Sequence, residues 1–215
     1  MELAFCAENN TLVERAIGLG ATRVELCDNL AVGGTTPSYG VIRETVRLAH
    51  SHGAPVMVMI RPRGGSFEYD EGELRIMETD VSVARELGAD GVVFGCLRDG
   101  WLDERANRRL LDCAHGMNVT FHMAFDDLPT MRGRLRAIDW LTGNGARRIL
   151  THGGRAGTPI EDNLPELRSY VERAAGRIGI LPGGGVTYEN AGRICAELGV
   201  NEAHGTRIVP WDTRG

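Results

Sequence analysis

Two arginines follow one apolar run of this chain, in the segment Arg61-Pro62-Arg63-Gly64-Gly65. The run itself, residues 56–60, has a composition typical of a buried parallel strand. Guanidinium groups make charge-assisted hydrogen bonds to carboxylates and phosphates, and glycines let the backbone approach a ligand closely. In α/β proteins, ligands bind at the carboxyl ends of the strands. Arg61 and Arg63 are therefore candidate anion-binding residues.

Other ionisable side chains stand at or just after the ends of further strand-like runs. A histidine with its ordinary pKa near 6.5 can transfer protons, and a nearby carboxylate can orient it or act as its partner. We expect His122 to be the acid or base, with Glu25 or Asp126 beside it. The residues predicted to be catalytic are Glu25, Arg61, His122, Asp126 and His204.

Glycines offer a second kind of anion contact. Gly183, Gly184 and Gly185 follow the seventh strand-like run, and Gly205 follows the eighth. Backbone amides at these positions hold a phosphate in many (β/α)8 barrels. A tight turn would also use such glycines, so the prediction of an anion-binding loop depends on its place after that run.

Cys6 and Cys27 end the first two strand-like runs and are predicted to point the same way, with Met59 on the third. Two thiolates and a thioether form a soft ligand set suited to Cu(I). Cysteine and methionine are also common core residues, so packing alone is the alternative. The facing of Cys96 is open, and two further cysteines fall in helical patterns and are expected in the core: Cys113 and Cys195.

Short apolar runs alternate with amphipathic stretches along the whole chain. Strands are predicted at residues 3–6, 23–27, 56–60, 91–94, 119–122, 148–151, 178–181 and 202–204. Helices are predicted at residues 11–19, 37–51, 72–87, 104–114, 132–141, 164–173 and 190–198, with Pro37 in the first turn after Thr36. This alternation predicts a single-domain TIM (β/α)8 barrel over residues 1–215. A doubly wound open sheet is the alternative, and no GxGxxG motif opens the first unit.

The C-terminal end is too short for a complete barrel. Residues 207–215 are few and rich in helix breakers, so no full eighth helix is expected. Apolar barrel surface left uncovered there would favour a homodimer, with Val209 and Trp211 at the contact.

Side-chain alternation along the strands places charged groups inside the predicted barrel. Isolated buried charges are costly unless they are paired. The interior group is therefore either a ligand or catalytic site or a structural polar network. Its predicted members, near the C-terminal mouth, are Glu25, Arg61, His122, Glu202 and His204.

Composition narrows the classes of function. The net charge is −5 and no basic patch stands out, which argues against nucleic acid as a partner. No apolar run approaches the roughly 20 residues of a membrane span, and no basic leader opens the chain. The five cysteines show no CxxC pattern. We therefore expect reduced thiols in a cytoplasmic protein that does not bind membranes.

Along almost all of its length the chain resembles the CutC family. The resemblance rests on segments that include Arg61-Pro62-Arg63-Gly64-Gly65, Val119-Thr120-Phe121-His122, Ala124-Phe125-Asp126, Pro182-Gly183-Gly184-Gly185 and His204-Gly205. It implies a TIM barrel, a cytosolic location and a role linked to copper, with Cys6 and Cys27 at the positions proposed as copper ligands.

The chain departs from the family pattern at several positions. Met123 stands where the family usually has arginine, Ser66 where it usually has aspartate and Thr35 where it often has leucine. The usual ending after the last strand contains no cation, whereas here Arg207 follows Thr206. Whether Arg207 replaces the missing arginine in space is a question for the structure.

Two hypotheses from different classes follow. The first is a copper homeostasis protein that binds Cu(I) through Cys6 and Cys27. The alternative is a barrel enzyme acting on a small anionic or phosphorylated substrate through an arginine, histidine and glutamate cluster. A non-catalytic scaffold with a structural polar interior is the third interpretation.

Overall fold

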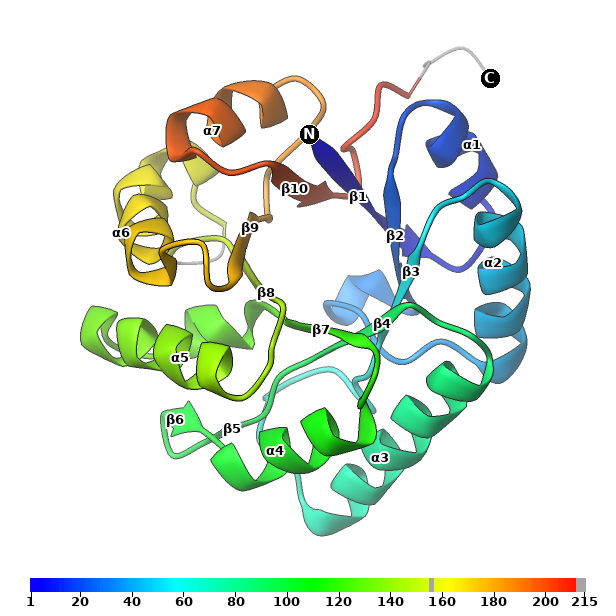
Figure 1. Ribbon diagram of the computed structural model, residues 1–215, viewed down its shortest axis with the longest axis horizontal. Helices are drawn as coiled ribbons and strands as arrows, with labels where there is room; N and C mark the ends of the chain where they lie inside the picture. The colour runs from blue at the N-terminus through cyan, green and yellow to red at the C-terminus, as the bar shows by residue number, and fades with distance from the viewer. Residues whose placement is uncertain (155–156, 212–215) are drawn as a thin grey trace.

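The computed structural model describes residues 1–154 and 157–211. Eight parallel strands form a nearly closed barrel in the order β10-β1-β2-β3-β4-β7-β8-β9, which confirms the TIM barrel (Figure 1). A parallel bridge between Thr187 and Arg207 links the segments that follow β9 and β10. The strands are β1 (Glu2–Glu8), β2 (Arg23–Cys27), β3 (Val56–Met59), β4 (Gly91–Phe94), β7 (Asn118–Phe121), β8 (Arg148–Thr151), β9 (Gly179–Pro182) and β10 (Glu202–Gly205).

Helices surround the barrel and bury their apolar faces against it (Figure 1). They are α1 (Val13–Gly18), α2 (Tyr39–Ser51), α3 (Glu71–Glu86), α4 (Glu104–Cys113), α5 (Met131–Gly143), α6 (Leu164–Ala174) and α7 (Ala191–Leu198). No helix follows β10 as far as residue 211, as predicted; residues 212–215 lie outside the described part. None of the described helices has the length and apolar character needed to cross a membrane.

Two local features differ from the sequence predictions. Helix α2 starts after Ser38, whose Oγ accepts a hydrogen bond from the Val41 backbone at 3.4 Å, so Pro37 lies before the helix and not in its first turn. A hairpin between β5 (Leu97–Arg98) and β6 (Trp101–Leu102) follows β4. It was not predicted because two-residue strands carry no periodicity.

The described part of the C-terminal segment, as far as residue 211, packs back onto the barrel. Val209 is fully buried within the chain, and the Trp211 ring packs edge-on against Phe5 with ring centroids 5.4 Å apart. Arg15 lies over the same indole ring. Val209 therefore cannot contact a second copy of the chain, contrary to the expectation. Phe5, on the outer face of β1, is already covered.

The barrel interior is divided into an ionic floor and a sulfur-rich upper part. At the floor, Glu202 forms an ion pair with Arg23 at 2.8 Å and accepts a hydrogen bond from Arg148 Nε at 2.5 Å. Glu202 was expected near the mouth, but it opens β10 and so lies at the opposite end from His204. Above the floor, buried apolar packing involves Cys6, Cys27, Met57, Met59 and Val93.

Candidate functional site

A cavity of about 270 Å³ lies at the C-terminal mouth of the barrel. It collects side chains from strands that are far apart in the sequence. Among the residues that line it are Cys6, Glu25, Cys27, Met59, His122 and His204. The structure therefore brings together both predicted metal ligands and three of the five residues predicted to be catalytic.

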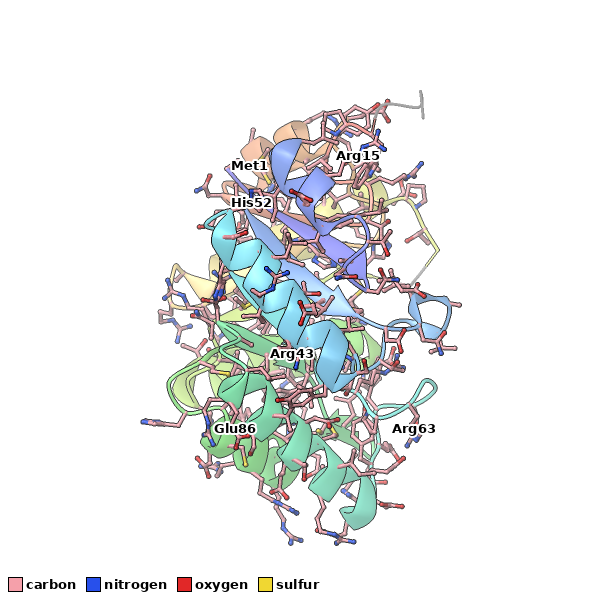
Figure 2. The ribbon with its side chains drawn as sticks, turned by 90° about the vertical axis from the view of Figure 1, so that its right-hand side faces the viewer. Met1, Arg15, Arg43, His52, Arg63 and Glu86 are labelled. Carbon is pink, nitrogen blue, oxygen red and sulfur yellow. The ribbon has the colours of Figure 1, made fainter. Side chains whose placement is uncertain are left out.

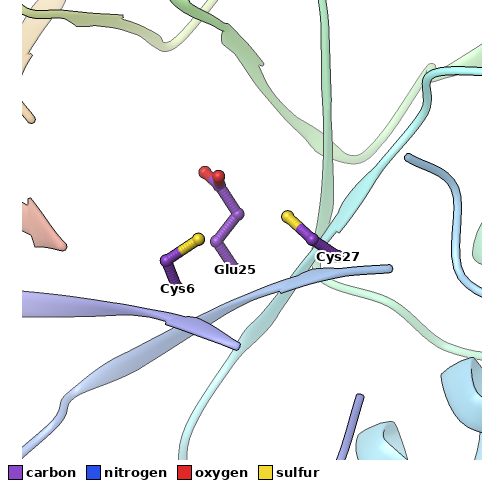
Figure 3. A group of neighbouring side chains, drawn as sticks. All are labelled: Cys6, Glu25 and Cys27. Atoms are coloured by element: carbon purple, nitrogen blue, oxygen red, sulfur yellow. The ribbon is translucent and has the colours of Figure 1, made fainter. Parts of the chain in front are cut away.

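Two thiols and a carboxylate converge at one side of this cavity. Strands β1 and β2 pair in parallel with Cys6 opposite Glu25, so that Cys6, Glu25 and Cys27 all face inward. Their sulfur and oxygen ligand atoms lie within 4.8 Å of one another (Figure 3). The group is buried, with exposed fractions of 8% for Cys6 and 1% for Cys27. Its soft atoms are suited to a thiophilic metal ion.

The pKa values of the two thiols are shifted in opposite directions. A hydrogen bond from Cys27 lowers the pKa of Cys6 well below its ordinary value, and His204 lowers it further against the opposing effect of burial. The same hydrogen bond, together with burial, raises the pKa of Cys27. Of the two, Cys6 therefore loses its proton more readily than Cys27.

Glu25 and His204 form a buried pair beside Cys6, with Glu25 Oε1 and His204 Nε2 3.6 Å apart. Burial raises the pKa of Glu25 to about 7, although the His204 charge opposes that rise. Burial lowers the pKa of His204, but Glu25 and Cys6 together outweigh it and bring the pKa to about 9. A positive His204 therefore lies between two groups that can be negative.

His122 is fixed in one orientation and kept neutral. Its Nδ1 accepts a hydrogen bond from the Ala124 backbone at 3.2 Å, and the Phe67 ring lies against it with centroids 4.8 Å apart. Burial and then the Arg61 charge lower the pKa of His122 to about 3. His122 is therefore neutral at neutral pH; this form lacks the second proton that a general acid gives up, and the role of base stays a prediction.

The ring of His122 occupies space that Gly95 leaves free at the end of β4. A Cβ atom on Gly95 would lie 2.8 Å from His122 Nδ1, closer than side chains approach. The nitrogen at the other end of the ring, Nε2, is buried and has no hydrogen-bond partner among the described residues. His122 is thus placed by its neighbours without using all of its hydrogen-bonding capacity.

Arg61 donates from both of its terminal nitrogens to backbone carbonyl groups, whereas its buried Nε has no hydrogen-bond partner among the described residues. Its guanidinium donates to the carbonyl oxygens of Val32 at 2.8 Å, Gly34 at 2.9 Å and Gly65 at 2.8 Å. It also lies over the Phe67 ring at 4.8 Å, and the residue is only 4% exposed. These contacts connect the loops after β2 and β3 and hold Phe67 against His122, whereas an anion clamp with free donors was expected.

Arg63 points away from the cavity. Figure 2 shows it on the loop after β3, at the edge of the molecule. Its Nε donates to Glu73 Oε1 at 2.5 Å, and other donors reach the carbonyls of Ser66 and Glu68. Glu73 also closes the capping box at the start of α3. Arg63 therefore connects its loop to α3.

Asp126 lies beside a second, larger cavity of about 960 Å³. It accepts hydrogen bonds from Thr151 Oγ1 at 2.5 Å and from the His152 backbone at 2.8 Å, and burial raises its pKa. Asp126 is thus separated from the first cavity, which Glu25 lines. Sequence reasoning missed His152, although a histidine directly after the run 148–151 was a usable signal.

Close packing and backbone conformation require the glycines in the loop after β9, and the loop also lies beside both cavities. A Cβ atom on Gly183 would lie 2.6 Å from Leu150, and Gly184 and Gly185 adopt positive φ angles of 75° and 96°. Gly184 and Gly185 line both cavities, and Gly205 lines the first. The Gly183 amide donates to the Thr151 carbonyl and is not free for a ligand.

Arg207 answers the question raised by Met123. Both residues line the first cavity. Met123 stands where the family usually has arginine, and Arg207 brings a cation to the cavity from the end of β10, where the family pattern has none. Arg207 is exposed, and no described carboxylate forms an ion pair with it.

Comparison with known proteins identifies the family. The family model described as CutC family matches residues 1–209. The chain belongs to the CutC family. The family protein CutC of Enterococcus faecalis is 56% identical over 206 residues, which cover 95% of this chain and 98% of that protein. A human protein named copper homeostasis protein cutC homolog is 41% identical over 189 residues, 86% of this chain and 65% of that protein.

Solved structures agree with this assignment. The crystal structure of a CutC protein from Streptococcus agalactiae has a TM-score of 0.94 and 50% identity, and covers 97% of this chain and 100% of that one. A deoxyribose phosphate aldolase from Aeropyrum pernix is 13% identical with a TM-score of 0.72, covering 96% of this chain and 85% of that one. At that identity the likeness concerns the barrel fold alone.

Proposed function

We propose that this CutC family protein binds Cu(I) through Cys6 and Cys27 and serves in copper homeostasis. The observation that carries the proposal is the approach of the ligand atoms of Cys6, Glu25 and Cys27 to within 4.8 Å of one another, on the wall of a cavity. The name of the human relative, a copper homeostasis protein, supports the same function.

The two sulfurs lie within 4.8 Å of each other, close to the spacing that one ion between them requires. A thiolate binds a first-row metal ion at about 2.3 Å, as it does Zn²⁺, so two sulfurs on opposite sides of one ion are up to about 4.6 Å apart. Met59 is a third soft candidate, because its methyl group and the Cys27 sulfur both border Gly34. The oxygens of Glu25 are harder and already face His204.

The neighbouring charges favour a monovalent cation. Thiolates are the metal-binding form of cysteine, and the low pKa of Cys6 provides one thiolate in advance of binding. A second proton leaves Cys27 when a metal binds. The resulting negative charge is offset by the ion and by His204.

A competition titration with a chromophoric Cu(I) chelator under anaerobic conditions tests the proposal. The wild-type protein is expected to take up one equivalent of Cu(I). Cys6→Ser and Cys27→Ser are each expected to weaken binding by more than about 100-fold, because even loss of an outer-shell partner costs about 10–100-fold. Cys113→Ser is the matched control, since Cys113 ends helix α4 outside the cavity. Equal affinity in all four proteins would exclude the proposed site.

An enzyme acting on a small anionic substrate is the second candidate function. The observation that favours it is that Arg207, Gly184 and Gly205 line the same cavity as the Glu25–His204 pair. Under this hypothesis Glu25 and His204 transfer the proton, and Arg61 keeps the loops after β2 and β3 in place. A thermal-shift screen of carboxylates and phosphate esters tests it, and no stabilisation by any of them would count against it.

A further inference from the structure

His122 is a hydrogen-bond donor without an acceptor. Because the Ala124 amide donates to Nδ1, that nitrogen carries no hydrogen in the neutral ring, and the hydrogen must be on Nε2. His122 Nε2 is buried and has no partner among residues 1–154 and 157–211. Buried donors are almost always paired, so an unpaired one on a cavity wall indicates an absent acceptor.

The ring cannot turn to find another partner. The Phe67 ring packs against it with centroids 4.8 Å apart, and the Arg61 guanidinium lies 4.8 Å from the centroid of that Phe67 ring. Gly95 is in contact with the ring where any side chain would collide. The Arg61 charge and the burial that keep the pKa of His122 low also keep it a neutral donor at physiological pH.

The cavity lining indicates the charge and size of the missing acceptor, since Cys6 and Glu25, the lining groups that can be negative, are compensated by His204. Arg207 brings an exposed guanidinium that forms no ion pair with a described carboxylate. Phe67, Leu150 and Met59 supply apolar wall, and the volume of about 270 Å³ suits a molecule of a few carbon atoms. A short apolar body with a carboxylate at one end meets each of these conditions.

We propose that the cavity binds a small organic carboxylate, with one carboxylate oxygen accepting from His122 Nε2 and the Arg207 guanidinium at the rim. Hydrogen bonds to a charged acceptor are the stronger kind, and arginine pairs well with carboxylates. Binding does not depend on the copper proposed above, because neither donor belongs to the thiol pair. In this arrangement the arginine–proline–arginine segment acts indirectly, since Arg61 positions the donor and does not touch the ligand.

The test uses metal-free protein carrying ¹⁵N-labelled histidine, with pyruvate as the probe. The Nε2–H resonance of His122 is expected to shift saturably with pyruvate and not with acetone, which lacks the charge. His122→Asn keeps an acceptor for Ala124 but has no donor at the position of Nε2, and is expected to weaken binding about tenfold or more. His122→Gln, whose amide reaches the Nε2 position, is expected to restore part of the affinity.

Further variants separate this proposal from the others. Arg207→Gln is expected to weaken pyruvate binding, and Met123→Arg, which adds a second cation to the lining, to strengthen it. Cys113→Ser, whose residue lies outside the cavity, is expected to bind pyruvate as the wild type does. No saturable shift with pyruvate, unchanged affinity in His122→Asn, or binding of inorganic phosphate in its place would overturn the proposal.

Discussion

The pKa of His122 predicts a measurable sensitivity of the fold to acid. The folded protein holds that pKa at about 3, whereas the value in an unfolded chain is near 6.5. As the pH falls below 6.5, His122 becomes protonated in the unfolded chain but stays neutral in the folded protein. The free energy of unfolding therefore decreases. Between pH 7 and pH 5 the loss is about 2 kcal/mol, because each pH unit well below 6.5 contributes about 1.4 kcal/mol.

Glu25 acts in the opposite direction and must be separated from His122. Its pKa is raised to about 7, so the folded protein binds that proton before the unfolded chain does and gains stability as the pH falls from 7 towards 4.5. The wild-type profile therefore contains two opposing contributions. A comparison of the wild type with His122→Asn cancels the contribution of Glu25, because both proteins contain Glu25.

Urea unfolding of the wild type and of His122→Asn at pH 7 and pH 5 measures the effect. Relative to the wild type, the variant is expected to gain about 2 kcal/mol of unfolding free energy on going from pH 7 to pH 5. His115→Asn, which replaces an exposed histidine, is the control and should follow the wild type. Parallel pH profiles for the wild type and His122→Asn would refute the assigned environment of His122.

Three further predictions follow from the site. Arg61→Met removes three hydrogen bonds, one buried and two partly buried, and is expected to destabilise the fold by about 3 kcal/mol or more. Arg63→Met, at a half-exposed ion pair, should cost about 1 kcal/mol or less, and urea unfolding of both variants compares the two losses of unfolding free energy. Cys6 should be the first cysteine alkylated by iodoacetamide at neutral pH, as mass spectrometry of early time points would reveal, because its pKa is lowered. Glu202→Gln weakens the pairing of Arg23 at the barrel floor and is expected to lower the midpoint of thermal unfolding, and an unchanged midpoint would argue against that floor.

The barrel could be predicted from the sequence because its signals are local. Apolar runs of four or five residues marked the strands, and side-chain alternation correctly placed Cys6, Glu25, Cys27 and His204 on the inner face. Alternation gives the face of a residue but not its height in the barrel. Glu202 shares a face with His204 yet lies at the floor, because it opens its strand.

The role of Arg61 could not be predicted because it depends on the path of two loops. Its partners are the carbonyls of Val32, Gly34 and Gly65, and carbonyl groups are present at every residue of any sequence. The sequence marks a cation at a strand end, but not whether backbone or ligand satisfies it. The homodimer and the cytoplasmic location remain predictions, and a solution mass measurement tests the first.

The most direct test of the central claim is the X-ray absorption spectrum of the protein loaded with Cu(I) and freed of excess copper. Coordination by Cys6 and Cys27 predicts a first shell made of sulfur, which disappears in the Cys6→Ser/Cys27→Ser double variant. Copper that washes out of the wild type, or a first shell of nitrogen and oxygen alone, would contradict a Cu(I) site at these two thiols.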